Sequence, residues 1–187
     1  MAAALRMTIQ DLEGFPIPLD DRRYEIIDGD LSVPTQPHWG HQMSAANIIH
    51  ALVAWNRQTG AGAVFDAPGI IFAQDSAVAP DVVWVSAEQL DAVRGDDGKL
   101  HAAPDLVVEL LSPGADNEKR DRESKLSLYS RQGVREYWIV DWQRQELQIY
   151  RRIDAQLTLA TTLLAKDVVQ SPSLPGFAVP LSEFFSD

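Results

Sequence analysis

The sequence contains no cysteine among its 187 residues. This excludes disulfide bonds, thiolate zinc sites, iron–sulfur clusters and cysteine nucleophiles, and it fits a reducing compartment. Long hydrophobic runs are also missing, because the longest apolar stretches have only the length of a β-strand. The first residues lack the apolar run of a signal peptide. We therefore expect a cytoplasmic protein without a membrane segment.

Basic residues are scarce as well. The chain has 16 lysines and arginines against 27 aspartates and glutamates, a formal net charge of −11. A surface that is basic throughout is excluded, so any nucleic-acid contact must come from a local patch. Hydrophobic residues make up 45% of the chain, enough for a folded core. The length predicts a single domain over residues 1–187, in which residues 1–20 form an irregular lead-in with room for one helical turn.

Turn and periodicity signals predict a mixture of strands and helices. Asp28-Gly29 is typical of a two-residue hairpin turn between strands 24–27 and 31–33. Helices are expected at 38–58, ended by Gly60, at 86–90, capped by Ser86, and at 116–132. Strands are expected at 63–66, 69–73, 78–85, 104–113, 134–141, 146–152 and 156–164, and a loop at 171–176. The fold class is therefore α/β or α+β: a central mixed sheet flanked by helices, with added hairpins toward both ends.

Glu109 interrupts an apolar run, Leu106-Val-Val-Glu-Leu-Leu111, that otherwise predicts a strand buried on both faces. Removing an unpaired carboxylate from water costs on the order of several kcal/mol. Because side chains alternate along a strand, Glu109 shares a face with Asp105 and Val107. A glutamate at a strand end can also pair with an arginine or face solvent, so its position alone leaves both interpretations open.

Asp81 opens a second apolar strand, in Val78-Ala-Pro-Asp-Val-Val-Trp-Val85. Aspartate after proline is also common at turns, and taken alone this position favours a structural role. If the two strands are neighbours, the carboxylates of Asp81 and Glu109 can lie on one face, where their repulsion favours a cation between them. Mg²⁺, and after it Mn²⁺, suits a site built only from oxygen atoms.

Lys125 lies inside the apolar side of an otherwise polar helix. At about 100° per residue, Leu126, Leu128 and Tyr129 bracket it. Its side chain can extend along the surface into solvent, or it can direct its ammonium group at the carboxylates of the sheet. In the second case it would stabilise developing negative charge or orient an attacking water.

The same helix concentrates positive charge. Residues 117–135 contain six basic and three acidic side chains. Such a helix can simply be a solvated face, but Lys119, Arg120 and Arg122 are candidates for contacting nucleic acid.

These residues, in this order, resemble the PD-(D/E)XK nuclease superfamily, and more narrowly the Uma-two family of restriction-endonuclease-like proteins. The matching segments are 24–29, His41, 79–83, 103–113, Lys125 with Tyr129, 133–141 and 171–177. They extend over nearly the whole chain. The resemblance implies a restriction-endonuclease-like core built on a central mixed sheet.

The resemblance also implies roles for single residues. Asp81 matches the motif aspartate of the superfamily and Glu109 its acidic residue. The superfamily usually places a lysine two residues after that acid, but position 111 is leucine here, and Lys125 on the following helix takes its place. Glu25 is a weaker candidate for a metal-side carboxylate, and His41 is another weak candidate at the site.

We therefore hypothesise an endonuclease that hydrolyses phosphodiester bonds of DNA with Mg²⁺ or Mn²⁺. Asp81, Glu109 and the backbone carbonyl of Leu110 would hold the metal, and Lys125 would complete the catalytic group. DNA and a second copy of the chain are the expected partners. Trp138 and Trp142 would mark the dimer interface if they were exposed, although aromatic residues in strands are more often buried.

Two alternatives remain open at this point. A catalytically silent binding or assembly module on the nuclease scaffold would agree better with the acidic charge. A metal hydrolase of a small substrate could use the same carboxylates.

Overall fold

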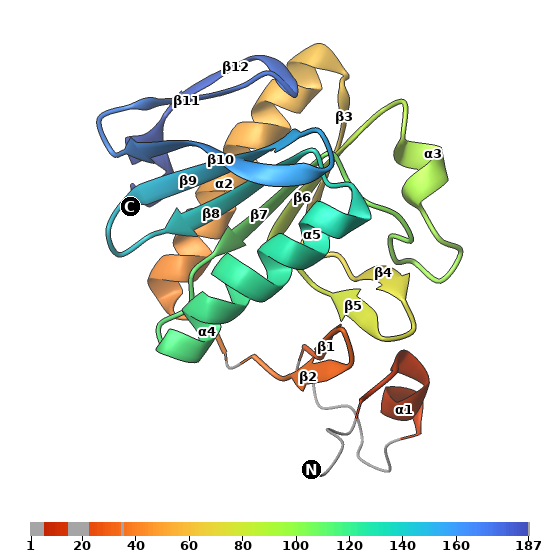
Figure 1. The fold of residues 1–187 in the computed structure, drawn as a ribbon. Helices are drawn as coiled ribbons and strands as arrows, with labels where there is room; N and C mark the ends of the chain where they lie inside the picture. Colours follow the sequence, from red (N-terminus) through yellow and green to blue (C-terminus); the bar gives the residue numbers. More distant parts are fainter. Residues whose placement is uncertain (1–5, 15–22, 35, 187) are drawn as a thin grey trace.

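The computed structural model describes residues 6–14, 23–34 and 36–186. Its centre is a six-stranded sheet in the order β10-β9-β8-β7-β6-β3 (Figure 1). The strands are β3 (Gly62–Asp66), β6 (Val82–Ser86), β7 (Leu106–Leu110), β8 (Glu136–Asp141), β9 (Glu146–Ile153) and β10 (Gln156–Leu164). Strands β7 and β8 run parallel and the other neighbours antiparallel, so the sheet is mixed.

Helices cover both faces of this sheet. Helix α2 (Trp39–Thr59) lies on one face, and Figure 1 shows α5 (Leu126–Gln132) in front of the other. Alternation along the strands divides the core accordingly: Val108 packs in the cluster that contains α2, and Val107 in the cluster that contains α5. Glu109 follows the same alternation and points to the α5 side.

Smaller elements surround this centre. A four-stranded sheet in the order β2-β1-β5-β4 consists of β1 (Glu25–Ile27), β2 (Asp30–Ser32), β4 (Ile70–Ala73) and β5 (Ser76–Val78). The remaining elements are α1 (Ile9–Glu13), α3 (Leu90–Val93), α4 (Ala115–Lys119), the π-helical segment η1 (Arg120–Lys125), the hairpin β11 (Val168–Ser171) and β12 (Leu174–Pro180), and the 3₁₀ helix η2 (Leu181–Phe185). Within the described ranges no helix is long and apolar enough to cross a bilayer.

The structure confirms the fold class and the hairpin at Asp28-Gly29, where both residues have positive φ (51° and 82°), as a turn of this kind requires. The helix at 38–58 is confirmed as α2, which ends at Gly60 in the left-handed conformation. A short helix, α1, lies in the expected lead-in; the part of the lead-in with Pro16 and Pro18 falls outside the described residues.

Three expectations are wrong in detail. The strand at 78–85 is two strands, because Pro80 has no N–H to continue a ladder, and β5 and β6 belong to different sheets. Ser86 does not cap a helix: it ends β6, and its N–H donates to Asp105 Oδ2 at 2.7 Å. The expected loop at 171–176 belongs to the β11–β12 hairpin, because burial of Leu174 and Phe177 against the core overrides its proline-rich composition.

Trp138 is fully buried in the core, and its Nε1 donates to Glu136 Oε1 at 2.6 Å. It therefore cannot mark an interface between copies of the chain. Trp142 is half-buried.

Candidate active site

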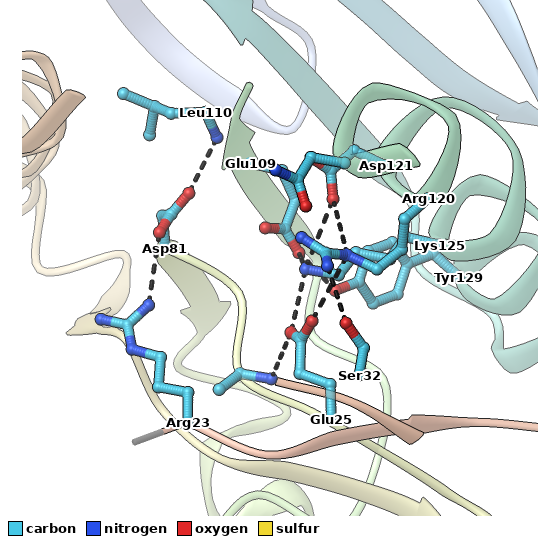
Figure 2. A network of polar contacts seen from close by, with 12 residues as sticks. Arg23, Glu25, Ser32, Asp81, Glu109, Leu110, Arg120, Asp121, Lys125 and Tyr129 are labelled. Atoms are coloured by element: carbon cyan, nitrogen blue, oxygen red, sulfur yellow. Dashed lines mark hydrogen bonds and ion pairs between the residues drawn. The ribbon is translucent and has the colours of Figure 1, made fainter. Parts of the chain in front are cut away.

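The pairing of β6 with β7 brings the two predicted carboxylates together. Val82 lies opposite Val108, so the next position along this antiparallel register places Asp81 beside Glu109. Both line a cavity of about 470 Å³ where β7 ends. Figure 2 shows the polar groups around it, which come from the small sheet, from the end of β7 and from η1.

Glu109 is almost completely enclosed, with 4% of its side chain exposed. Lys125 Nζ donates to its Oε1 at 2.9 Å, and the Tyr129 hydroxyl donates to the same oxygen at 2.8 Å. Burial, together with the neighbouring Glu109 charge, raises the pKa of Tyr129 well above its usual value, so the hydroxyl stays a donor.

Asp81 occupies the break between β5 and β6, with 12% of its side chain exposed. Its Oδ2 accepts the Leu110 N–H at 2.9 Å and lies 3.3 Å from His41 Nε2, while its Oδ1 lies 3.4 Å from an Arg23 nitrogen. Burial alone would raise the pKa of Asp81. The contacts with His41, the Leu110 amide and the charge of Lys125 outweigh burial and hold this pKa below its ordinary value. Asp81 is therefore an anion at neutral pH.

Lys125 directs its ammonium group at the carboxylates and does not reach solvent. Its Nζ lies 2.9 Å from Glu25 Oε1, 2.9 Å from Glu109 Oε1 and 3.6 Å from Asp121 Oδ1, and 3% of the side chain is exposed. Burial would lower the pKa of Lys125, but the three carboxylates outweigh it and raise this pKa above its ordinary value. The ammonium group is thus held charged and in one place.

Glu25 fixes the small sheet to the site. Its Oε1 also accepts the Ala79 N–H at 3.1 Å, two residues before Asp81. Figure 2 shows Glu25 and Glu109 on opposite sides of the Lys125 ammonium group.

The π-helical segment η1 changes which helix residues reach the site. With α-helical spacing of about 100° per residue, Arg120 would point away from Lys125. The wider π turn brings residues five apart toward the same side. Arg120 instead lies over the cavity: its Nη1 donates to Ser32 Oγ at 2.8 Å, and its Nε lies 3.7 Å from both Glu25 and Asp121.

The other two basic candidates have different surroundings. Lys119 is exposed, as a nucleic-acid contact would require. Arg122 is only partly exposed, and its Nη1 donates to Gln148 Oε1 at 2.6 Å. Of the three predicted nucleic-acid contacts, Lys119 alone is fully on the surface.

Two residues of the site, Asp121 and His41, were missed or underrated from the sequence. Asp121 was missed, although its i, i+4 spacing to Lys125 on one helix was the available signal. His41, a weak candidate, lies within the site: its Nε2 is 3.1 Å from the Leu110 carbonyl oxygen, and it is 6% exposed. Its Nδ1 is buried and has no hydrogen-bond partner within the described part of the chain.

Comparison with known proteins decides the family. The Uma2 family, described as "Putative restriction endonuclease", matches residues 9–182. The chain belongs to the Uma2 family. A crystal structure of a putative nuclease belonging to DUF820 from Anabaena variabilis matches with a TM-score of 0.74 and 16% identity, over 96% of this chain and 97% of that one. At this identity the likeness shows the fold, and the family and fold together indicate a nuclease. No curated protein matches.

The charges of the side chains in this Uma2 site do not balance, and a further cation would neutralise the excess. Four carboxylates line it: Glu25, Asp81, Glu109 and Asp121. They face three cationic side chains: Lys125, Arg120 and the half-exposed Arg23. Two buried oxygens, Glu25 Oε2 and Asp121 Oδ1, have no hydrogen-bond partner among the described residues. Both oxygens face Arg120 Nε at 3.7 Å, and the excess of negative charge in the site is what a bound cation would relieve.

The donor set fits Mg²⁺ or Mn²⁺ better than a metal that needs a full cage of side chains. In the described ranges no three histidine or acidic side chains are arranged as a metal cage. Mg²⁺ commonly binds through one or two carboxylates, with water and substrate phosphate as its other ligands. Asp81 and Glu109 supply two carboxylates, and the Leu110 carbonyl can accept from His41 and still offer a second lone pair.

The burial of Glu109 also lowers the stability of the folded protein by an amount that can be measured. Burial, with the neighbouring charges of Asp121, Asp81 and Glu25, raises the pKa of Glu109 well above 4.5, although Lys125 opposes the shift. Because the folded protein releases this proton at a higher pH than the unfolded chain, the stability of the native protein falls as pH rises from about 4.5 through the raised pKa of Glu109.

We therefore expect Glu109→Gln, which cannot ionise, to be more stable than the native protein at about pH 8 in EDTA. The advantage should shrink toward about pH 5, where the unfolded glutamate begins to regain its proton. Urea denaturation at the two pH values measures it. At each pH, the measurement gives the stability of the Gln variant relative to the native protein. If this difference were less favourable to the variant at pH 8 than at pH 5, the raised pKa of Glu109 would be contradicted.

Proposed function

We propose that this Uma2 protein is a metal-dependent endonuclease that hydrolyses phosphodiester bonds of DNA. One observation supports this most strongly: Asp81 and Glu109 lie at adjacent strand ends in one cavity, with the Lys125 ammonium group 2.9 Å from Glu109. Anionic oxygens that can hold a divalent cation, next to a fixed positive charge, are what phosphodiester hydrolysis requires.

The metal would be held by Asp81, Glu109 and the carbonyl of Leu110. When bound, it would lower the pKa of water and neutralise charge on the phosphate. His41 contacts both Asp81 Oδ2 and the Leu110 carbonyl, and so fixes two of these three oxygens. Tyr129 fixes the third through its hydrogen bond to Glu109.

Lys125 would stabilise the negative charge that builds on the phosphate oxygens as water attacks phosphorus and the P–O bond to the leaving sugar oxygen breaks. Glu25 and Asp121 keep the ammonium group charged and in place, so little reorganisation is needed at the moment of reaction. Arg120 holds these two carboxylates from the other side.

The direct test is cleavage of supercoiled plasmid by the purified protein. We expect nicked and linear products with Mg²⁺ or Mn²⁺, and no product when EDTA removes the metal. Rising salt should slow the reaction, because DNA binding depends on phosphate contacts. If neither plasmid nor a single-stranded oligonucleotide is cut in the presence of either metal, the proposal is refuted and a catalytically silent binding module is favoured.

A further inference from the structure

Three aromatic rings form a row beside the cavity. The rings of Trp142 and His38 are stacked, with centroids 4.9 Å apart and planes inclined by 17°. His38 in turn contacts Trp39, at 5.1 Å between centroids. Exposure increases along the row, from half-buried Trp142, through exposed His38, to Trp39, which is 69% exposed.

The inner end of this row is held rigidly. Trp142 Nε1 donates to the Leu111 carbonyl at 3.1 Å, which ties the ring to the end of β7. The ring also lies against Gly40, where an added Cβ would come within 2.5 Å of Trp142 Cζ3. His38 Nδ1 accepts the Gly40 N–H at 3.0 Å and thereby caps α2. The stack is thus fixed by three backbone contacts before any ligand arrives.

The row adjoins the proposed catalytic groups. Pro37, His41 and Gln42, which flank the row in sequence, line the same cavity as Asp81 and Glu109. Leu111, which accepts from Trp142, directly follows the Leu110 carbonyl of the proposed metal site. A nucleotide next to the cleaved phosphate would therefore lie within reach of these rings.

Electrostatics favours a ligand that binds through its bases. The chain carries a net charge of −11, and two of the three basic residues expected to contact phosphate are partly buried and already bonded within the protein. Stacking of a base on an aromatic ring strengthens binding by about 5- to 150-fold without any charge. Bases in a duplex are stacked on each other, so only an unpaired base can use such a ring.

We propose that the row of Trp142, His38 and Trp39 binds an unpaired nucleobase of the strand being cleaved, which makes single-stranded or locally unpaired DNA the substrate. The proposal rests on the proposed nuclease function and specifies its substrate.

The test compares three fluorescein-labelled probes by anisotropy in EDTA, so that no strand is cut: a dT oligonucleotide, an abasic strand of the same length and a duplex of the same length. We expect the dT strand to bind at least about 10-fold more tightly than the abasic strand or the duplex. Trp39→Ala should weaken binding of the dT strand at least about 5-fold and leave the abasic strand unchanged, and Trp39→Phe should retain most of the affinity.

Ile153→Ala is the matched control, because Ile153 is also an exposed apolar residue (59%) but ends β9 beside the start of β8, whereas Trp142 follows the end of β8. Equal binding of the dT and abasic strands, no measurable binding of either, or an unchanged Trp39→Ala variant would overturn the inference. Failure of the nuclease proposal gives a different result: the dT preference persists, but neither plasmid nor the dT strand is cut when Mn²⁺ is present.

Discussion

Asp81→Asn and Glu109→Gln should each reduce metal-dependent plasmid cleavage by at least about 100-fold. Both substitutions keep the shape of the side chain, and each amide oxygen can still accept the hydrogen bond that its carboxylate accepts, from Leu110 N–H in one case and from Lys125 in the other. What is lost is the negative charge that would hold the cation. The loss of activity should therefore occur in a folded protein.

A second readout separates metal binding from catalysis. Mn²⁺ should raise the melting temperature of the native protein, because a ligand that binds only the folded state stabilises it. This increase should be absent in both variants. Glu88→Gln, an exposed glutamate outside the cavity, is the matched control and should behave like the native protein in both assays. If either variant cleaved plasmid at the native rate, that residue would have no part in the mechanism.

Lys125→Met should lower the free energy of unfolding by about 3–5 kcal/mol and abolish cleavage. The substitution leaves Glu25, Glu109 and Asp121 in a buried site without the ammonium group that lies within 3.6 Å of each. Removing one partner of a buried ion pair costs this much because the remaining charge is uncompensated. Chemical denaturation at neutral pH measures the loss.

Two further variants define the cause of that loss. Lys119→Met, on the exposed side of the same helical segment, should change stability by less than about 0.5 kcal/mol. The double variant Glu109→Gln with Lys125→Met should be more stable than Lys125→Met alone, since one of the stranded carboxylates is then neutral. If the double variant were no more stable than Lys125→Met alone, the electrostatic explanation would be wrong.

Local patterns in the sequence predicted three of the residues that line the site. An acid inside each of two apolar strands indicated Asp81 and Glu109, and a lysine among apolar helix positions indicated Lys125. These signals work because burial makes a charged residue costly unless another group compensates it. The structure places all three at one cavity, while their catalytic roles remain predictions.

Other parts of the site could not be read from local patterns. The position of Arg120 over the cavity was not foreseen, because a regular α-helical spacing does not anticipate the π-helical segment. Asp121 looked like one more charge on a solvated helix, but it is buried at the cavity beside Arg120 and Lys125. The tail at 171–176 was assigned to a loop because its Pro and Ser content says nothing about the apolar surface that it covers.

The sequence by itself determined the class of the fold, the two acidic strands and the lysine, because these depend on alternation, helical spacing and the cost of burying charge along a short stretch of chain. Only the tertiary structure decided that Glu25 and Asp121 share the Lys125 ammonium group, that His41 reaches Asp81, and that Trp39, His38 and Trp142 form a row. These contacts join segments that are distant in the chain, and their geometry is set by the strand register and the packing of α2 and η1 on the sheet.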